Sequence, residues 1–165
     1  MTTTTILYID MDNVLVNFQS GIDRLDETTR KVYDGRLDEV PGIFALMDPV
    51  EGAVEAVQRL SEQYDVYVLS TAPWRNPSAW MHKVEWIQRY FGKGNDSVLY
   101  KRLIISHHKN LNRGTIIIDD RTKNGVDRFE GRHIHFGTDA FPDWKSVLDE
   151  LMNKNDGVRQ FLEDN

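Results

Sequence analysis

Apolar residues occur in five short runs that are separated by longer, more polar segments. Each run is rich in β-branched and aromatic residues, and Asp, Ser or Gly stands at or near its end, which is typical of strands. The runs cover residues 6–10, 65–70, 102–106, 115–120 and 133–137. The isoleucines at 116–118 do not alternate with polar residues, as expected of a strand that is buried on both faces. The pattern therefore predicts five strands.

Three further segments have the apolar spacing of amphipathic helices. The first begins at Asp48, where Asp48 as N-cap, Pro49 at N1 and Glu51 at N3 predict a capping box. Its expected buried face consists of Val50, Ala53, Val54, Val57 and Leu60. The second helix is expected at 77–91 and the third at 143–153.

The alternation of strands and helices predicts an α/β fold, with a Rossmann-like, mostly parallel sheet core that is covered on both faces. A chain of 165 residues, 40% of them hydrophobic, is long enough for one buried core and short for two. We therefore expect a single domain over residues 1–165. Residues 17–48 break the alternation, because they are charged and irregular before an apolar patch at 43–47. They are expected to form a small helical cap inserted after the first strand.

The composition narrows the classes of partner and compartment. A net charge of −6 and a pI near 5.3 argue against binding to a nucleic-acid polymer, because that affinity depends on many Lys and Arg contacts to phosphate. The chain has no cysteine, which excludes disulfides and thiolate metal sites. It has no apolar stretch of about 18 residues, and its start, MTTTT, does not resemble a signal peptide. We therefore expect a cytoplasmic protein with no membrane span, and a homodimer is left open.

Polar side chains collect at the predicted ends of three strands. They are Asp10 and Asp12 after the first strand, Ser70 and Thr71 after the second, and Asp119 and Asp120 after the fourth. In an open α/β sheet, ligands bind beyond the carboxyl ends of the strands, so these groups are expected to meet at one edge. Lys109 lies in the loop before the fourth strand and can reach the same edge.

The four carboxylates among these groups would repel each other. A like-charged pair about 4 Å apart costs about 4 kcal/mol at an effective dielectric constant near 20, so some would be protonated or a cation would lie among them. Oxygen donors without cysteine suit a hard ion such as Mg²⁺. On its own, however, a D-x-D after a strand is more often a turn or a cap, Thr71 serves equally well as a cap, and Lys109 in a polar loop is usually solvated.

Such a set of groups can hydrolyse a phosphoester. One carboxylate attacks phosphorus to form an aspartyl-phosphate, which divides one difficult displacement into two easier ones. A second carboxyl group gives a proton to the leaving oxygen and later takes one from water, while Mg²⁺ and a lysine neutralise the phosphoryl oxygens. The sequence contains each of these parts.

The order of these motifs resembles a known superfamily. DMDNV at 10–14, STAP at 70–73, Lys109 and IDDR at 118–121 are similar to the motifs of the haloacid dehalogenase superfamily of phosphohydrolases. The segments DMDNVLVNF, FALMDPVEGAVEAV and WIQRYFG further resemble the 5'(3')-deoxyribonucleotidase family. Together these segments span most of residues 6–125.

The resemblance implies a role for each matching residue. Asp10 would be the nucleophile and Asp12 the general acid and base. Mg²⁺ would be held by Asp10, the main-chain carbonyl of Asp12, and Asp120. Thr71 would donate a hydrogen bond to the phosphate, and Lys109 would stabilise its negative charge.

Other positions are less firmly assigned by the resemblance. Asp119 would position the waters of the metal or Lys109, although the roles of Asp119 and Asp120 are interchangeable on the sequence alone. Phe18 and Phe44 match walls of the nucleoside site, yet aromatic residues at such positions are more often core. Ala72, beside the phosphate, stands where animal relatives carry a hydroxyl. Asn13 stands where Gly is common, and Asn tolerates a left-handed backbone better than most residues.

The leading functional prediction is a Mg²⁺-dependent phosphatase that acts on nucleoside monophosphates, with a preference for deoxyribonucleotides. A first alternative is the same chemistry on another small phosphoester, since one fold serves many substrates. A second is a receiver-like signalling domain, although such domains have their acidic pair at the first strand, whereas the doublet at 119–120 lies late. A third is a nucleotide-binding module without turnover.

Overall fold

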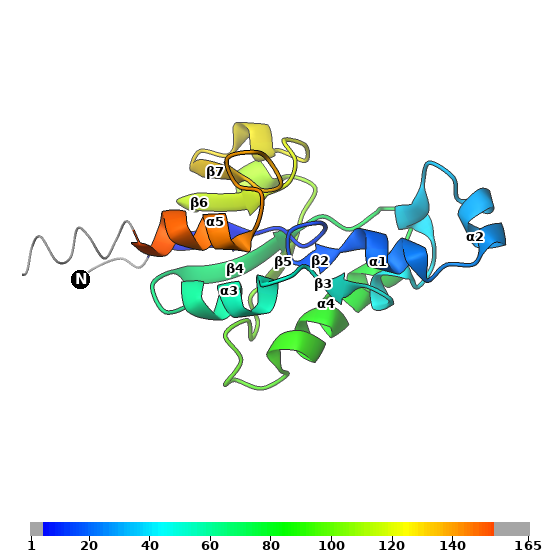
Figure 1. Cartoon of the computed structure of the whole chain (residues 1–165), viewed down its shortest axis with the longest axis horizontal. Coiled ribbons are helices and arrows are strands. Elements are labelled where there is room, and N and C mark those ends of the chain that lie inside the picture. The colour runs from blue at the N-terminus through cyan, green and yellow to red at the C-terminus, as the bar shows by residue number, and fades with distance from the viewer. Residues whose placement is uncertain (1–4, 154–165) are drawn as a thin grey trace, which may run out of the picture.

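The core of the protein is a five-stranded parallel sheet, which is flanked by helices (Figure 1). The computed structural model describes residues 5–153. The strands are β1 (Ile6–Ile9), β4 (Asp65–Ser70), β5 (Leu103–Ile105), β6 (Ile116–Asp119) and β7 (Arg132–His135). Their order across the sheet is β5-β4-β1-β6-β7, and all neighbouring pairs are parallel. The α/β fold and the five strands are therefore as predicted.

Each face of the sheet has its own apolar cluster. In β1, Leu7 and Ile9 point into the larger cluster, whereas Tyr8 points into the smaller one. The larger cluster includes residues of α3 (Ala53–Leu60) and α5 (Trp144–Leu148), which cover that face together. The smaller cluster is completed by Val126 at the start of the 3₁₀ turn η4 (Val126–Arg128). Among residues 5–153, no helix is both long and apolar enough to cross a membrane.

Two of the three predicted helices have the expected start. The helix α4 (Pro77–Phe91) has the predicted bounds and ends at Gly92. The third predicted helix is α5, whose N-cap Asp143 forms a capping box with Ser146, and it continues as a π-helical turn over Asp149–Asn153.

The predicted capping box at the first helix is wrong. α3 begins only at Ala53, after Gly52 in a left-handed conformation with φ of 77°. Asp48 and Pro49 instead form the short strand β3 (Asp48–Pro49), which pairs antiparallel with β2 (Val16–Asn17). The Asp48 carboxylate accepts a hydrogen bond from Arg24 at 2.6 Å. Long-range pairing and this ion pair therefore replace the local capping signal. Of the predicted buried face, Ala53, Val57 and Leu60 are buried in α3, whereas Val54 is half-buried and Val50 precedes the helix.

The segment 17–48 forms short helices beyond the carboxyl ends of the strands (Figure 1). They are α1 (Phe18–Asp23), α2 (Glu27–Val32) and the 3₁₀ turns η1 (Leu37–Glu39) and η2 (Ile43–Ala45). The η2 turn packs against α4. The buried Asn76 amide fixes the loop between η1 and η2 by donating to the carbonyls of Asp38 (2.9 Å) and Val40 (3.0 Å).

Candidate active site

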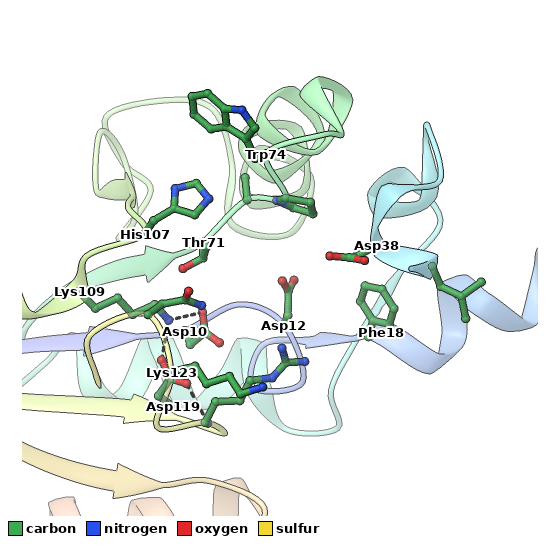
Figure 2. A pocket seen from close by; sticks show the side chains of 15 residues that line it. Asp10, Asp12, Phe18, Asp38, Thr71, Trp74, His107, Lys109, Asp119 and Lys123 are labelled. Carbon is green, nitrogen blue, oxygen red and sulfur yellow. Dashed lines mark hydrogen bonds and ion pairs between the residues drawn. The ribbon is translucent and has the colours of Figure 1, made fainter. Parts of the chain in front are cut away.

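A cavity of about 520 Å³ opens at the carboxyl edge of the sheet, beside the segment 17–48 (Figure 2). Most of the residues predicted from the sequence line it: Asp10, Asp12, Phe18, Thr71, Ala72, Lys109 and Asp119. Parallel strands bring these distant residues together, because β1, β4 and β6 are neighbours and all end at this edge. The predicted convergence of the motifs is thus present in the structure.

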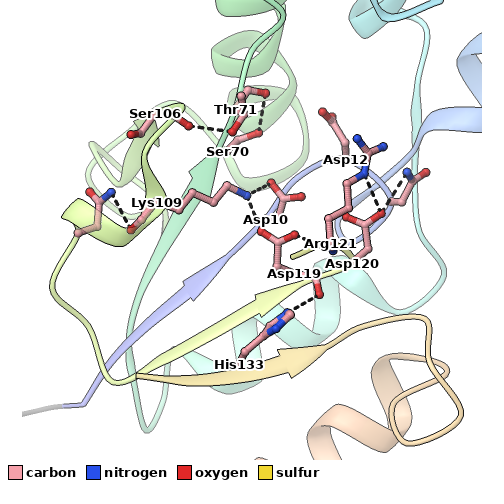
Figure 3. A network of polar contacts seen from close by, with 12 residues as sticks. Asp10, Asp12, Ser70, Thr71, Ser106, Lys109, Asp119, Asp120, Arg121 and His133 are labelled. Carbon is pink, nitrogen blue, oxygen red and sulfur yellow. Dashed lines mark hydrogen bonds and ion pairs between the residues drawn. The ribbon is translucent and has the colours of Figure 1, made fainter. Parts of the chain in front are cut away.

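Lys109 lies at the centre of the acidic groups. It begins the 3₁₀ turn η3 (Lys109–Leu111), its side chain is only 3% exposed, and its main-chain N–H donates to the Asn124 carbonyl at 2.8 Å. Its Nζ donates to Oδ1 of Asp10 at 2.8 Å and to Oδ2 of Asp119 at 2.5 Å (Figure 3). Burial lowers the pKa of Lys109, but the two carboxylates outweigh this effect and raise the pKa above its ordinary value. Lys109 is therefore a fixed cation between Asp10 and Asp119.

The two adjacent aspartates after β6 are held in different ways. Asp119 is buried, and its Oδ1 accepts from the main-chain N–H of Arg121 at 2.9 Å. Burial and the nearby Asp10 raise the pKa of Asp119 to about 7, and the same two causes raise the pKa of Asp120. The main-chain carbonyls of Asp119 and Asp120 accept hydrogen bonds from the Nε2–H groups of His133 and His135, each at 3.0 Å. The two histidines of β7 thus fix the main chain of the doublet.

Asp10, Asp119 and Asp120 fit a divalent cation. Each offers a carboxylate oxygen, and these oxygens lie within 4.8 Å of one another. Oδ1 of Asp120 is buried and has no hydrogen-bond partner in the described part of the chain. Since a buried carboxylate oxygen without a donor is costly, this atom is suited to a metal ion. Burial, and after it the repulsion from Asp10, raises the pKa values of Asp119 and Asp120, and a bound cation would oppose both effects.

Asp12 stands apart from this acidic cluster. Its Oδ1 accepts a hydrogen bond from Nζ of Lys83 at 2.8 Å. Burial is the largest influence on the pKa of Asp12 and raises it, and Lys83 opposes this only in part. No motif in the sequence includes Lys83. The sequence nevertheless marks Lys83 as unusual, because it shares the apolar face of α4 with Ala79 and Trp86, where a charged residue is rare.

The residues at the ends of β1 and β4 lie partly as expected. The hydroxyl of Thr71 donates to the Ser106 carbonyl at 2.8 Å and lies at the cavity. Ala72 follows it on the cavity wall and offers no side-chain donor there. Asn13 has a φ of 60°, so it adopts the left-handed conformation that the Gly position requires.

Of the two aromatic residues that match walls of the nucleoside site, one lines the cavity and one does not. Phe18 lines the cavity and packs edge-to-face on Phe44, with their ring centroids 5.8 Å apart. Phe44 itself is only 3% exposed and lies behind Phe18, outside the cavity lining, so it does not form a wall. Trp74, which no motif in the sequence includes, is 81% exposed at the rim beside His107. Its place two residues after Ala72 was the available signal.

The fold is the one found in haloacid dehalogenase-like hydrolases. The structure resembles the HAD-hydrolase YfnB from Bacillus subtilis, described as bound to magnesium, with a TM-score of 0.56 and 11% identity over 92% of this chain and 100% of that one. It also resembles the haloacid dehalogenase-like family protein SP0104 from Streptococcus pneumoniae, with a TM-score of 0.50, 14% identity and 92% of each chain covered. At such identities the likeness shows the fold alone.

Sequence comparison identifies the family within this class. Residues 27–146 match the family described as 5' nucleotidase, deoxy (pyrimidine), cytosolic type C, and the chain belongs to this family of phosphoric monoester hydrolases. It is 59% identical over 150 residues to a provisionally named 5'(3')-deoxyribonucleotidase of Vibrio phage KVP40, covering 91% of this chain and 86% of the relative. It is 30% identical over 153 residues to the 5'(3')-deoxyribonucleotidase of Bacillus subtilis, covering 79% and 84%. The resemblance stated from the motifs is confirmed.

Proposed function

We propose that the protein hydrolyses nucleoside monophosphates, with a preference for deoxyribonucleotides, in a Mg²⁺-dependent reaction through an aspartyl-phosphate on Asp10. One observation carries the proposal. Asp10 is held by Lys109 at 2.8 Å within a cluster of three carboxylates, whereas Asp12 faces the same cavity outside that cluster. The arrangement provides one carboxylate for attack, a separate one for proton transfer and a site for a cation.

Asp10, Asp120 and the main-chain carbonyl of Asp12 would hold Mg²⁺. Asp119 would serve the site indirectly, because both of its oxygens already accept hydrogen bonds, from Lys109 and from the Arg121 N–H. The orphaned Oδ1 of Asp120 supports this division of roles. When bound, the ion would supply positive charge that neutralises the phosphoryl oxygens and the carboxylates.

The residues of the chain account for both chemical steps. A carboxylate oxygen of Asp10 forms a bond to phosphorus, the bond from phosphorus to the ester oxygen breaks, and Asp12 gives its proton to that oxygen. Asp12 then takes a proton from a water molecule, which attacks phosphorus and frees Asp10. Lys109 stabilises the phosphoryl charge, and the Thr71 hydroxyl turns from the Ser106 carbonyl to donate to phosphate.

The nucleoside would lie between the sheet edge and the segment 17–48, which we propose acts as the cap. A cavity of about 520 Å³ is within the range of pockets that enclose small ligands. Phe18 would offer its ring face to the base or sugar, with Phe44 supporting it from behind. The names of the relatives, 5'(3')-deoxyribonucleotidases, support the substrate class. Ala72 would leave the phosphate with one contact fewer than a hydroxyl would provide.

A substrate panel tests the proposal. The protein is incubated with nucleoside monophosphates and with sugar phosphates, with Mg²⁺ or with a chelator, and released phosphate is measured. We expect chelator-sensitive release that is fastest with dUMP or dTMP, and loss of turnover with retained dUMP binding in Asp10→Asn. Activity on sugar phosphates alone would refute the substrate class, and full activity of Asp10→Asn would refute the mechanism.

The proposal also includes the cellular location and the oligomeric state of the enzyme. We propose a cytoplasmic location, as expected from a cysteine-free acidic chain, and cell fractionation tests it. The homodimer left open by the sequence is tested by sedimentation of the purified chain.

A further inference from the structure

Lys83 is a buried lysine that lies outside the sequence motifs and yet contacts Asp12. It belongs to α4, and its side chain is 0% exposed. Its Nζ donates to Oδ1 of Asp12 at 2.8 Å and to Oγ of Ser70 at 3.0 Å, and lies 4.6 Å from the ring centroid of Phe44. Since an ammonium group has three N–H donors, these contacts occupy it fully. Lys83 is thus not available to bind a phosphate.

Packing alone does not account for a lysine at this position. Its neighbours on the same face of α4, Ala79, Trp86 and Ile87, are buried and apolar. Lysine is rarely fully buried without a partner, because removing an ammonium from water carries a large desolvation penalty. A methionine would fill a similar volume without that penalty. The charge therefore serves its partner Asp12.

Two lysines divide the acidic groups of the site between them. Lys109 binds Asp10 and Asp119 within the three-carboxylate cluster, and Lys83 binds Asp12, which is outside it. Without its own cation, the carboxylate of Asp12 is free to adopt other rotamers, including ones that face the cluster. Lys83 thus keeps the proposed proton carrier apart from the nucleophile.

One oxygen of Asp12 is held and the other is open. Oδ1 is the atom bonded to Lys83, and within residues 5–153 no hydrogen bond reaches Oδ2. Asp12 lines the cavity, with its carboxylate between Thr71 and Asp38 in Figure 2. We propose that Lys83 is a positioning residue that holds Asp12 by Oδ1, so that Oδ2 faces the ester oxygen of the substrate. This inference rests on the proposed function, since it concerns the proton that Asp12 passes to the leaving oxygen.

The dependence of the rate on the leaving group tests this role. A nucleoside leaves as an alkoxide and needs a proton, whereas p-nitrophenolate leaves without one. The ratio kcat/KM reports only the steps up to departure of the leaving group, so the later hydrolysis of the phosphoenzyme does not obscure it. For Lys83→Met, kcat/KM with dUMP is expected to fall about 10²- to 10³-fold, which is the lower part of the range of about 10²- to 10⁴-fold for a general acid. With p-nitrophenyl phosphate it is expected to fall less than about 10-fold, because no proton is needed.

Two further variants distinguish a specific effect on Asp12 from a general effect on folding. Ile87→Val alters the same buried face of α4 without touching Asp12, and both substrates are expected to keep the wild-type kcat/KM. Ser70→Ala removes one hydrogen-bond partner of Lys83 and leaves Asp12 intact. It is expected to lower kcat/KM for dUMP about 5-fold, as for one lost hydrogen bond, and to leave p-nitrophenyl phosphate unchanged. Ser70→Ala decides the question if Lys83→Met does not fold.

The outcomes separate this inference from the proposed function. Equal losses on both substrates, or no loss on dUMP, overturn the positioning role while the phosphatase reaction stands. A wild-type protein without Mg²⁺-dependent release from either substrate, or an Asp10→Asn variant as active as wild type, overturns the proposed function, and the role of Lys83 is then rejected with it.

Discussion

The crowding of carboxylates around Lys109 makes the stability of the metal-free protein depend on pH. In the unfolded chain Asp119 loses its proton near its ordinary pKa of 3.8, whereas in the folded protein its pKa is about 7, mainly because the side chain is buried and next because Asp10 lies nearby. Between these values the folded state binds more protons than the unfolded state. Stability from this group is therefore present at low pH and is lost as the pH rises from about 4 to 7.

The size of the loss follows from the shift in pKa. The difference between 3.8 and about 7 is roughly 3 units, and each unit corresponds to about 1.4 kcal/mol. The free energy of unfolding is thus expected to fall by at most about 4 kcal/mol across this range, a large part of the total stability of a small domain. A divalent cation among the same carboxylates favours their charged forms and is expected to oppose the loss.

Urea unfolding of wild type and Asp119→Asn at pH 5 and pH 8, with a chelator present, measures the contribution of Asp119 to the pH dependence of stability. The amide does not titrate, so the difference between the two proteins isolates Asp119 from the other ionisable groups. About two pH units lie between pH 5 and the folded pKa of about 7, so we expect wild type to lose about 2 to 3 kcal/mol more than Asp119→Asn between the two pH values, and Mg²⁺ to recover part of it at pH 8. Parallel pH profiles for the two proteins would refute the reasoning.

Two further predictions concern the groups around the site. Lys109→Met leaves its carboxylate partners without a cation, so chelated protein at pH 8 is expected to lose about 3 to 5 kcal/mol in urea unfolding; an unchanged midpoint would show that the ion pairs are not stabilising. Trp144→Phe removes the hydrogen bond from Nε1 to the Val14 carbonyl at 2.8 Å, and it is expected to cost about 1 to 3 kcal/mol while kcat with dUMP stays within about 2-fold. A large fall in kcat would instead connect Trp144 to the turn after β1 that contains Asp10 and Asp12.

The sheet and the residues at its carboxyl edge are predictable because they depend on local patterns and one rule of topology. Each strand is marked by its own apolar run, and parallel strands bring their ends to the same edge. Asp10, Thr71 and Asp119 therefore converge although they lie far apart in the sequence, as the cavity lining shows. The conformation of Asn13 is predictable for the same reason, since its left-handed φ of 60° is a local property of the turn after β1.

The start of α3 and the place of Phe44 are not predictable in this way, because non-local contacts decide them. Asp48 has a good local capping sequence, but it pairs with Asn17 and forms an ion pair with Arg24, and these contacts place it in β3. Phe44 matches a wall position, but the packing of η2 on α4 turns its ring behind Phe18 and over the ammonium of Lys83. A motif identifies which residues are near a site, and packing decides which of them reach the ligand.

Lys83 shows why a helix residue is harder to assign to a site than a residue at a strand end. A strand end is at the active edge by topology alone, whereas the direction of a helix residue depends on how the helix is rotated against the sheet. In α4 that rotation places Lys83 beneath Asp12 and between Ser70 and the ring of Phe44. The useful signal was a charged residue on an apolar helix face, which requires a buried partner of opposite charge. In the structure Lys109 pairs with Asp10 and Asp119, and Lys83 is the cation that pairs with Asp12.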